Sequence, residues 1–387
     1  MGANGSTGGR RIRVGLIFGG KSGEHEVSLA SAQSVARAIN RDKYDIALIG
    51  ITKDGCWISG DHALKELAAA SPSPLLLPNG DPTSSDSPEH RVIDSWELVP
   101  QDAHSLAPVS PLAAIDVAFP LVHGPFGEDG TIQGLLELAD IPYVGAGVAA
   151  SAVGMDKALM KAVFQAHGLP IVDWVVVLRR EWEMNPDGVI QQIEKAFGYP
   201  CFIKPANLGS SVGVSKAHNA AEVREGLALA AQYDRKLIAE RSAEGCREIE
   251  CSVLGNDEPI ASIPGEILPK REFYDYAAKY EKDSGTELVV PADLSPATTG
   301  QLQEMAVKAF RAIDASGMAR VDFFVERGTD RIILNEINTI PGFTAVSMYP
   351  KMWDKTGLSY SDIIDRLIRL ALERQADKRK NKTSYGS

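Results

Sequence analysis

Two neighbouring apolar segments, Met318–Val325 and Arg331–Asn338, are interpreted as β-strands joined by a four-residue link, Glu326–Thr329, that contains a glycine. A link of this length fits a hairpin, which lays the two strands side by side. Because strand side chains alternate between the two faces of a sheet, every second residue shares a face. The polar residues grouped in this way are Arg320 with Asp322, and Glu336 with Asn338. The chain is therefore expected to carry a β-hairpin with one strongly polar face.

The polar face of this hairpin suits a metal ion bound to phosphate oxygens. Asp322, Glu336 and Asn338 offer the carboxylate and amide oxygens that Mg²⁺ prefers. Arg320 beside them could meet the phosphate itself. For the hairpin taken alone, the alternative is a solvated polar face with one salt bridge.

A second signal for phosphate lies at the end of another apolar strand. Lys204 closes the strand Pro200–Lys204, and the glycine-rich segment Gly209–Gly213 follows as the tip of a second hairpin. Glycines let backbone N–H groups approach phosphates, and a lysine adds a point charge. Such a tip is a weak signal by itself, but it strengthens the first one because Mg²⁺ and phosphates imply one another.

Three further charged residues are candidates for contacts with a nucleotide. Lys157 in Gly154–Lys157 could be a phosphate cation, although alone it would be an ordinary helix lysine. Glu240 and Glu248 flank a connector between two β segments, where an adenosine could sit. Each of the two glutamates, taken singly, could equally be a residue without such a role.

The rest of the chain is expected to alternate helices and strands. The first α/β domain should contain a β-α-β unit with strands at Ile12–Phe18 and Tyr44–Ile51 and a helix at Ser28–Ile39, after a loop at Gly19–Glu26. Two later strands are expected at Val117–Val122 and Pro142–Val144. Ser71–Glu89 is rich in Pro, Ser and Asp, which predicts an exposed insertion. Later helices are expected at Ala220–Tyr233 and Ala297–Ala315, and later strands at Leu237–Glu240, Ile249–Leu254 and Ile260–Ile263. A long loop is expected at Phe273–Ser284, and a last helix should begin at Ser359, where Ser359–Asp362 resembles a capping box.

Two matches to nucleotide-binding motifs are rejected. Gly15–Ser22 satisfies the phosphate-loop pattern GxxxxGK[ST], but its first glycine would have to end a strand that the apolar residues Leu16–Phe18 continue. Gly145–Ala150 fits the dinucleotide pattern GxGxx[GA], yet no acidic residue follows about 20 positions later at the end of a second strand. An ordinary strand-to-helix turn is the better explanation of the second match.

Composition bounds the class of protein. The 387 residues suggest two or three domains at about 150 residues each. A net charge of −11 argues against a nucleic-acid partner, since such domains usually carry basic patches. The four cysteines form no CxxC pair, so reduced thiols in the cytoplasm are expected. No apolar run is long enough for a membrane helix, and the match of Met1–Ser6 to a myristoylation pattern is better explained as a disordered leader.

Taken together, these residues resemble those of the ATP-grasp ligases, and the finer motifs are similar to those of the D-alanine–D-alanine ligases from about residue 12 to 372. The motifs that carry the resemblance are Gly23–Ser28, His123–Gly134, Gly154–Lys157, Ile203–Pro205, Gly209–Gly213, Tyr274–Tyr280, Ala319–Asp322 and Asn335–Thr344. The resemblance implies an α/β chain with an ATP-grasp fold and an N-terminal parallel-sheet domain. Pro125 and Phe126 depart from the smaller residues common in their loop, outside the expected chemical groups.

The resemblance also implies a reaction and a role for each matching residue. ATP would phosphorylate the carboxylate of one D-alanine, and the amine of a second would displace the phosphate, with two Mg²⁺ or Mn²⁺ ions assisting. The expected catalytic residues are Glu24, Ser210, Tyr280, Arg320 and Ser347. The expected substrate-binding residues are Glu24, His123, Lys279, Tyr280, Gly342, Ser347 and Met348. The expected ATP-binding residues are Lys157, Lys204, Ser210, Ser211, Glu240, Arg241, Glu248, Asn335 and Glu336. The expected metal ligands are Asp322, Glu336 and Asn338.

Five segments are expected from the resemblance: a disordered leader at 1–10, an N-terminal substrate domain at 11–153, a central ATP-grasp subdomain at 154–246, a C-terminal subdomain with the metal site at 247–375, and a tail at 376–387. A cytoplasmic homodimer without a nucleic-acid or membrane partner is implied as well. The alternatives are another ATP-grasp dipeptide ligase, a D-alanine–D-lactate ligase, or a non-catalytic nucleotide-binding module. Tyr280 favours an amine acceptor over lactate, and the complete metal set argues against the non-catalytic module.

Overall fold

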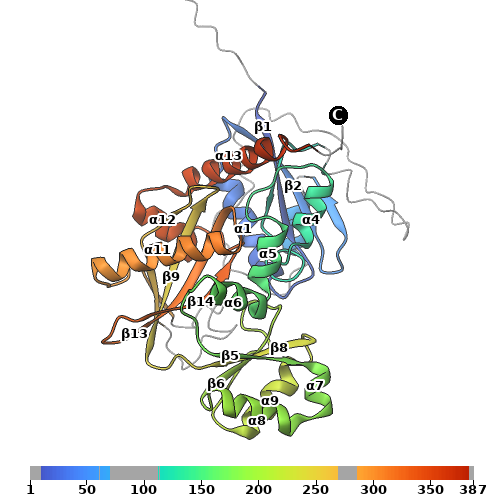
Figure 1. Ribbon diagram of the computed structural model, residues 1–387. Helices are drawn as coiled ribbons and strands as arrows, with labels where there is room; N and C mark the ends of the chain where they lie inside the picture. The colour runs from blue at the N-terminus through green and yellow to red at the C-terminus, as the bar shows by residue number, and fades with distance from the viewer. Residues whose placement is uncertain (1–9, 61, 70–111, 113, 269–285, 383–387) are drawn as a thin grey trace, which may run out of the picture.

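The computed structural model of the chain describes residues 10–60, 62–69, 112, 114–268 and 286–382. Three β-sheets organise these residues (Figure 1). One belongs to the N-terminal part, one to the central part and one to the C-terminal part of the chain. The expected insertion at 71–89 and the loop at 273–284, which includes Lys279 and Tyr280, lie outside the described residues.

The N-terminal sheet confirms the predicted β-α-β unit. Its strand order is β3-β2-β1-β4, in which β1 runs parallel to β2 and β4, while β3 is antiparallel to β2. The strands are β1 (Ile12–Gly19), β2 (Tyr44–Ile51), β3 (Trp57–Ser59) and β4 (Val117–Pro120). The helices of this part are α1 (His25–Ala38), α2 (Ala63–Ala69), α4 (Thr131–Leu138) and α5 (Val148–Met155). Pro142–Val144, expected as a strand, contributes a single bridge from Tyr143 to Ala118.

The structure supports the rejection of both nucleotide-binding motifs and corrects the predicted start of α1. Gly15 lies inside β1 opposite Ala47, so it cannot begin a phosphate loop. Gly147 occupies the N-cap position of α5, as an ordinary strand-to-helix turn requires. The expected start of α1 at Ser28 was wrong, because the helix begins at His25. The Ser28 hydroxyl, inside α1, donates to the carbonyl of Leu121, the residue after β4, at 2.6 Å and so joins the helix to that strand.

The central sheet has the order β5-β8-β6-β7, and all its pairs are antiparallel. Its strands are β5 (Trp174–Leu178), β6 (Cys201–Pro205), β7 (Ser215–Ala217) and β8 (Lys236–Arg241). Three helices pack against one face, around buried residues such as Ile203, Leu227 and Ala239; they are α7 (Arg179–Met184), α8 (Pro186–Ala196) and α9 (Ala220–Ala230). Alternation therefore leaves Phe202, Lys204 and Glu240 on the other face.

The C-terminal sheet confirms the predicted polar hairpin and places it at one edge. The strand path is β12-β11-β9-β13-β14, and β10 also pairs with β9. The strands are β9 (Cys246–Gly255), β10 (Ile260–Ala261), β11 (Gly265–Leu268), β12 (Glu287–Val289), β13 (Gly317–Glu326) and β14 (Ile332–Asn338). Helix α11 (Pro296–Ala312) belongs to the same apolar cluster as Val321 and Phe323, so it covers one face of this sheet.

The last helix packs against both the N-terminal and the C-terminal sheet (Figure 1). Helices α12 (Met348–Thr356) and α13 (Tyr360–Lys378) follow β14, and Ser359 caps α13 by accepting the Asp362 N–H, as predicted. α13 shares a core with β1 and β4 on one side and with β13 on the other. Arg374 strengthens this junction, because its guanidinium donates to the carbonyls of Gly145 and Tyr143 at 2.5 and 2.9 Å.

The described cysteines are free thiols, as expected, and Cys201 and Cys251 among them are buried. Within the described part of the chain, no helix is long and apolar enough to cross a membrane.

Candidate active site

The predicted polar face extends over three adjacent strands. Arg320 lies opposite Asn338 on β14, and Asp322 lies opposite Glu336. On the other side of β13, Asp322 faces Glu250 of β9. These pairings confirm that the four predicted residues share a face, and they add a third carboxylate that the sequence reading missed.

Arg320 is held by two carboxylates. Its Nε and Nη2 donate to the two carboxylate oxygens of Asp322, each at 2.7 Å, and Nε also lies 3.2 Å from Glu250 Oε2. Burial alone would lower the pKa of Arg320, but Asp322 and Glu250 outweigh it and raise the pKa well above its usual value. The guanidinium is therefore a fixed positive charge, and its planar fork is already oriented.

A β-bulge in β14 orients Glu336. Asp322 pairs with Glu336, whereas the next residue, Phe323, pairs with Leu334, so Asn335 is the extra residue of the bulge. Without the bulge, Leu334 and Glu336 would share a face by simple alternation. With it, Leu334 enters the apolar core while Glu336 stays beside Asp322.

The second part of the site lies on the polar face of the central sheet. Lys204 on β6 donates to Glu240 Oε2 of β8 at 2.6 Å, and Lys161 of helix α6 (Lys157–Ala166) lies 3.2 Å from Glu240 Oε1. Burial would raise the pKa of the Glu240 carboxyl, but the two lysines lower it to about 2. Lys157, on the first turn of α6, donates to the Leu208 carbonyl at 2.6 Å, beside the glycine-rich segment.

The two sheets face each other across this part of the site. Glu336 contributes to the charge environment of both Lys161 and Lys204, and Glu248 contributes to that of Lys204. The predicted nucleotide residues on the two sheets are therefore neighbours. Arg241, by contrast, pairs with Asp173 at 2.8 Å through an exposed side chain at the end of β8.

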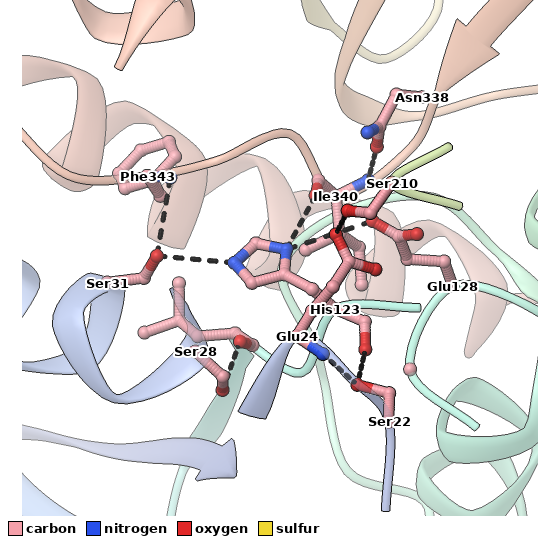
Figure 2. A network of polar contacts seen from close by, with 12 residues as sticks. Ser22, Glu24, Ser28, Ser31, His123, Glu128, Ser210, Asn338, Ile340 and Phe343 are labelled. Atoms are coloured by element: carbon pink, nitrogen blue, oxygen red, sulfur yellow. Dashed lines mark hydrogen bonds and ion pairs between the residues drawn. The ribbon is translucent and has the colours of Figure 1, made fainter. Parts of the chain in front are cut away.

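The glycine-rich segment reaches the N-terminal domain. The Ser210 hydroxyl donates to Glu24 Oε1 at the start of α1, as Figure 2 shows. Ser210 and Ser211 adopt left-handed φ angles of 50° and 58°. Such angles are uncommon for residues other than glycine, and successive left-handed residues fold the segment into a tight turn. The predicted contact between Glu24 and Ser210 is thus present.

His123 lies in a buried network beside Glu24 (Figure 2). Its Nδ1 donates to the Ile340 carbonyl at 3.0 Å, its Nε2 lies 3.2 Å from Ser31 Oγ, and Glu128 Oε1 is 3.8 Å from Nδ1. Burial would lower the pKa of His123, but Glu128 and then Glu24 outweigh it and raise the pKa. Burial and the neighbouring Glu24 raise the pKa of Glu128. The motif containing Glu128 was recognised from the sequence, but no role was assigned to this residue.

The segment after β14 leads from this network to the start of α12. The Thr344 backbone N–H donates to Ser347 Oγ at 3.1 Å, and a Cβ on Gly342 would lie 3.3 Å from the same oxygen. Ser347 is the N-cap residue of α12. The side chain of Met348 is buried against Ile267, so its backbone N–H is the group that could bind a carboxylate at this helix N-terminus.

Comparison with known families decides what this arrangement is. Residues 13–146 match the family model described as D-ala D-ala ligase N-terminus, and residues 163–369 match the one described as D-ala D-ala ligase C-terminus. The chain belongs to the D-alanine–D-alanine ligase family. Both halves of the molecule therefore match, in the order expected from the motifs.

Relatives and solved structures agree over nearly the full length. The chain is 49% identical to the D-alanine–D-alanine ligase of Acetivibrio thermocellus, over 96% of this chain and 99% of that protein. It is 47% identical to the ligase of the same name from Bacillus velezensis, over 95% of this chain and all of the relative. The D-alanine–D-alanine ligase structure from Coxiella burnetii superposes with a TM-score of 0.75 at 36% identity, covering 96% of each chain. A D-Ala:D-Ser ligase from Enterococcus faecalis superposes equally well, at 34% identity over 94% of this chain and all of that one. These likenesses confirm the predicted mixed α/β, ATP-grasp fold.

The predicted metal ligands suit Mg²⁺ by chemistry, but their side chains have other partners here. Asp322 is bound to Arg320 through both oxygens, and Asn338 Oδ1 accepts the Ile340 N–H at 2.9 Å. Among the described residues, no three acidic, histidine or cysteine side chains are grouped as a ready metal site. Carboxylate and amide oxygens can still share a cation with these donors, so the metal site stays a prediction.

Proposed function

We propose that this chain joins two D-alanine molecules into D-alanyl-D-alanine for cell-wall precursor synthesis. The reaction would proceed through an acyl phosphate and convert ATP to ADP and phosphate. The contact between Ser210 and Glu24 carries this proposal. It places an anionic carboxylate, which suits a substrate ammonium, directly against a glycine-rich segment, which suits phosphates. An amino acid held by its ammonium at Glu24 would thus present its carboxylate near the nucleotide.

The first substrate would be held by its ammonium group. Glu24 offers a carboxylate at the start of α1, and Ser210 orients it through a hydrogen bond. His123 lies beside this point and is fixed by Ile340 and Ser31. A rigid network of this kind favours one orientation of a small substrate, which reduces the entropy lost when the reacting atoms approach.

The carboxylate would be activated by phosphoryl transfer. One carboxylate oxygen attacks the γ-phosphorus of ATP and ADP leaves, and the acyl phosphate keeps that oxygen as its bridge. Arg320 lies on the face that would meet the transferring group, and its charge is fixed. Asp322, Glu336 and Asn338 would hold Mg²⁺, which when bound supplies positive charge to the phosphate oxygens. Catalysis in such transfers is mainly positioning and charge stabilisation.

The second substrate would bind by its carboxylate at the N-terminus of α12. The N–H groups at the start of a helix attract an anion, and Ser347 adds a hydroxyl. The free amine of this second D-alanine then attacks the acyl carbon, and phosphate leaves with the bridging oxygen. The peptide bond forms as the amine loses its proton to the surrounding medium.

Release of ADP and phosphate with defined acceptors tests this proposal. The reactions contain ATP and Mg²⁺ with D-alanine alone, with D-alanine plus D-serine or D-lactate, or with L-alanine alone, and mass spectrometry identifies the product. We expect ADP release with D-alanine alone, and D-alanyl-D-alanine as its product. Equal turnover with L-alanine alone, or turnover that requires D-lactate, would refute the assignment. A predominant D-alanyl-D-serine product would point instead to the activity of the D-Ala:D-Ser ligase from Enterococcus faecalis.

The family resemblance also supports a cytoplasmic homodimer. Sedimentation equilibrium of the purified chain tests the dimer, with a mass of twice 41.6 kDa expected. A single species at the monomer mass across the concentration range would contradict it.

A further inference from the structure

Lys161 is a completely buried charged residue with no role in the reaction described above. It lies on α6, four residues after Lys157, and its residue exposure is 0%. Residues four apart on a helix lie on the same face, so α6 presents both lysines to the central sheet. A lysine with no exposed surface needs a partner, because an isolated buried charge is strongly unfavourable.

The partner of Lys161 is Glu240, and Glu240 has a second lysine as well. Lys161 Nζ lies 3.2 Å from Oε1, and Lys204 Nζ lies 2.6 Å from Oε2. Glu240 itself is only 3% exposed. In the described residues, these two ammonium groups are the cations that lower the pKa of its carboxyl. One buried carboxylate is thus clamped between two lysines of different exposure.

The two lysines differ in what else they can reach. Lys204 closes β6 ahead of the glycine-rich segment, and its side chain keeps 14% of its surface exposed. It is the lysine placed to bind ATP phosphates. The Lys204 ammonium has three donors, but it carries one positive charge, for which a bound phosphate would compete with Glu240. When Lys204 turns towards the nucleotide, the buried Glu240 carboxylate would lose its share of that charge, and only a second cation could compensate.

We infer that Lys161 is a positioning residue that keeps Glu240 neutralised when Lys204 turns from this carboxylate to ATP. The inference rests on the proposed function, because it takes the nucleotide to bind between the two sheets. Lys161 acts through Glu240 and touches no substrate. Its loss should therefore weaken the binding of ATP while leaving the rate of the bound complex largely intact.

Lys161→Met tests this role, because methionine approximates the length of the side chain without its charge. We expect the Kd for ATP, measured by calorimetry, and the KM for ATP to rise about tenfold, a coupling of ordinary size between two sites. The kcat and the KM for D-alanine should change little. A control outside the site is Lys43→Met, which removes a more exposed lysine paired with Asp365 at 3.2 Å beside β2 and α13 and should leave ATP binding unchanged.

A double variant separates this role from simple packing. Glu240→Gln removes the carboxylate that Lys161 neutralises, so adding Lys161→Met to Glu240→Gln should change the Kd for ATP by less than about twofold relative to Glu240→Gln alone. If Lys161 only fills space in the core, Lys161→Met should weaken ATP binding as much in this background as in wild type. The double variant also carries no uncompensated carboxylate, so it keeps the test valid even if the single variant folds poorly.

Proton uptake on ATP binding provides an independent readout. Two charged groups face Glu240, Lys161 from α6 and Lys204 from β6. Its partners on the neighbouring strands, Trp174 and Phe202, are uncharged. From the opposite sheet, Glu336 affects the charge environment of both lysines and Glu248 that of Lys204. In Lys161→Met, ATP binding removes the last cation, which raises the pKa of Glu240 and makes it take up a proton. Calorimetry in buffers of different ionisation enthalpy should show more proton uptake in this variant than in wild type, approaching about one per ATP.

The outcomes distinguish the inference from the function on which it rests. If wild-type protein binds no ATP, the proposed function fails. If wild-type protein binds ATP and Lys161→Met binds it equally well, the inference about Lys161 fails alone. It also fails alone if Lys161→Met weakens ATP binding equally in the wild-type and the Glu240→Gln backgrounds and shows no extra proton uptake.

Discussion

Replacing Arg320 with lysine tests the centre of the site, because the two side chains carry the same charge but different geometry. Arg320 makes three close contacts, two with Asp322 at 2.7 Å and one with Glu250 at 3.2 Å. A single ammonium cannot reproduce this planar fork. It can keep one contact to Asp322 while it leaves the other oxygen and Glu250 without their donor.

The structure sets the expected size of the effect. Hydrogen bonds to charged groups contribute about 1.5–3 kcal/mol each, so two lost bonds amount to about 3–6 kcal/mol. If the oriented fork acts on charge that develops during phosphoryl transfer and amine attack, this loss appears in kcat as a factor of about 10²–10⁴. We therefore expect Arg320→Lys to lose at least about a hundredfold in kcat while it still binds ATP.

Steady-state kinetics and ATP calorimetry measure the two effects separately. The matched control is Arg247→Lys on β9 of the same sheet, since the Arg247 guanidinium makes a similar pair of contacts with Glu266 at 2.8 and 2.6 Å. Arg247 lies on the opposite face of the sheet from Asp322. The control should lose stability without a selective loss of kcat. An Arg320→Lys variant with intact kcat and weakened ATP affinity would show that Arg320 only anchors the ground state, and the reasoning would be refuted.

Three further predictions follow from single contacts. Glu336→Gln keeps the size of the side chain but removes its charge, so turnover should fall by orders of magnitude with an unchanged Tm; a near-wild-type rate at saturating Mg²⁺ would restore the solvated-face interpretation. Arg374→Ala should lower the unfolding free energy by about 3–5 kcal/mol in urea, because the carbonyls of Gly145 and Tyr143 lose a charged donor; a loss below about 1 kcal/mol would show that α13 docks without it. Burial would raise the pKa of Asp365, but hydrogen bonds from Tyr44 and Lys43 outweigh it and lower the pKa. A carboxyl with a lowered folded pKa stabilises the protein above its unfolded pKa, so the stability gap between wild type and Asp365→Asn should be constant from about pH 5 to 7 and shrink below about pH 4; a gap that widens on acidification would contradict this.

The polar hairpin shows how far local pattern can lead. Alternation along the two strands predicted the shared face of Arg320 and Asp322, and the pairing with Asn338 confirms it. The bulge at Asn335 was not predicted, although the buried residues Leu334 and Ile337 are three apart, a spacing that simple alternation does not give. A bulge is stabilised by the neighbouring strand and the core, so a single strand carries only an indirect trace of it.

The residues that the sequence did not reveal share one property. Lys161, Glu128 and Glu250 are charged and buried, and each is at most 8% exposed. A lysine on an amphipathic helix is usually solvated, and nothing local indicates that a distant carboxylate will bury it. Glu250 left a weak trace, since it is two residues from Glu248 and so shares a face of the strand with it. Burial and charge pairing of this kind depend on contacts between distant elements, whereas strand and helix patterns depend on neighbours.

The path of a carboxylate oxygen tests the proposed reaction most directly. D-Alanine labelled with ¹⁸O in both carboxylate oxygens is incubated with ATP, Mg²⁺ and the wild-type protein, and the released phosphate is examined by mass spectrometry. If the carboxylate attacks the γ-phosphorus and the amine later displaces phosphate, each phosphate leaves with one labelled oxygen for each dipeptide formed. Dipeptide formation accompanied by unlabelled phosphate would contradict the acyl-phosphate route and the roles assigned to the residues around it.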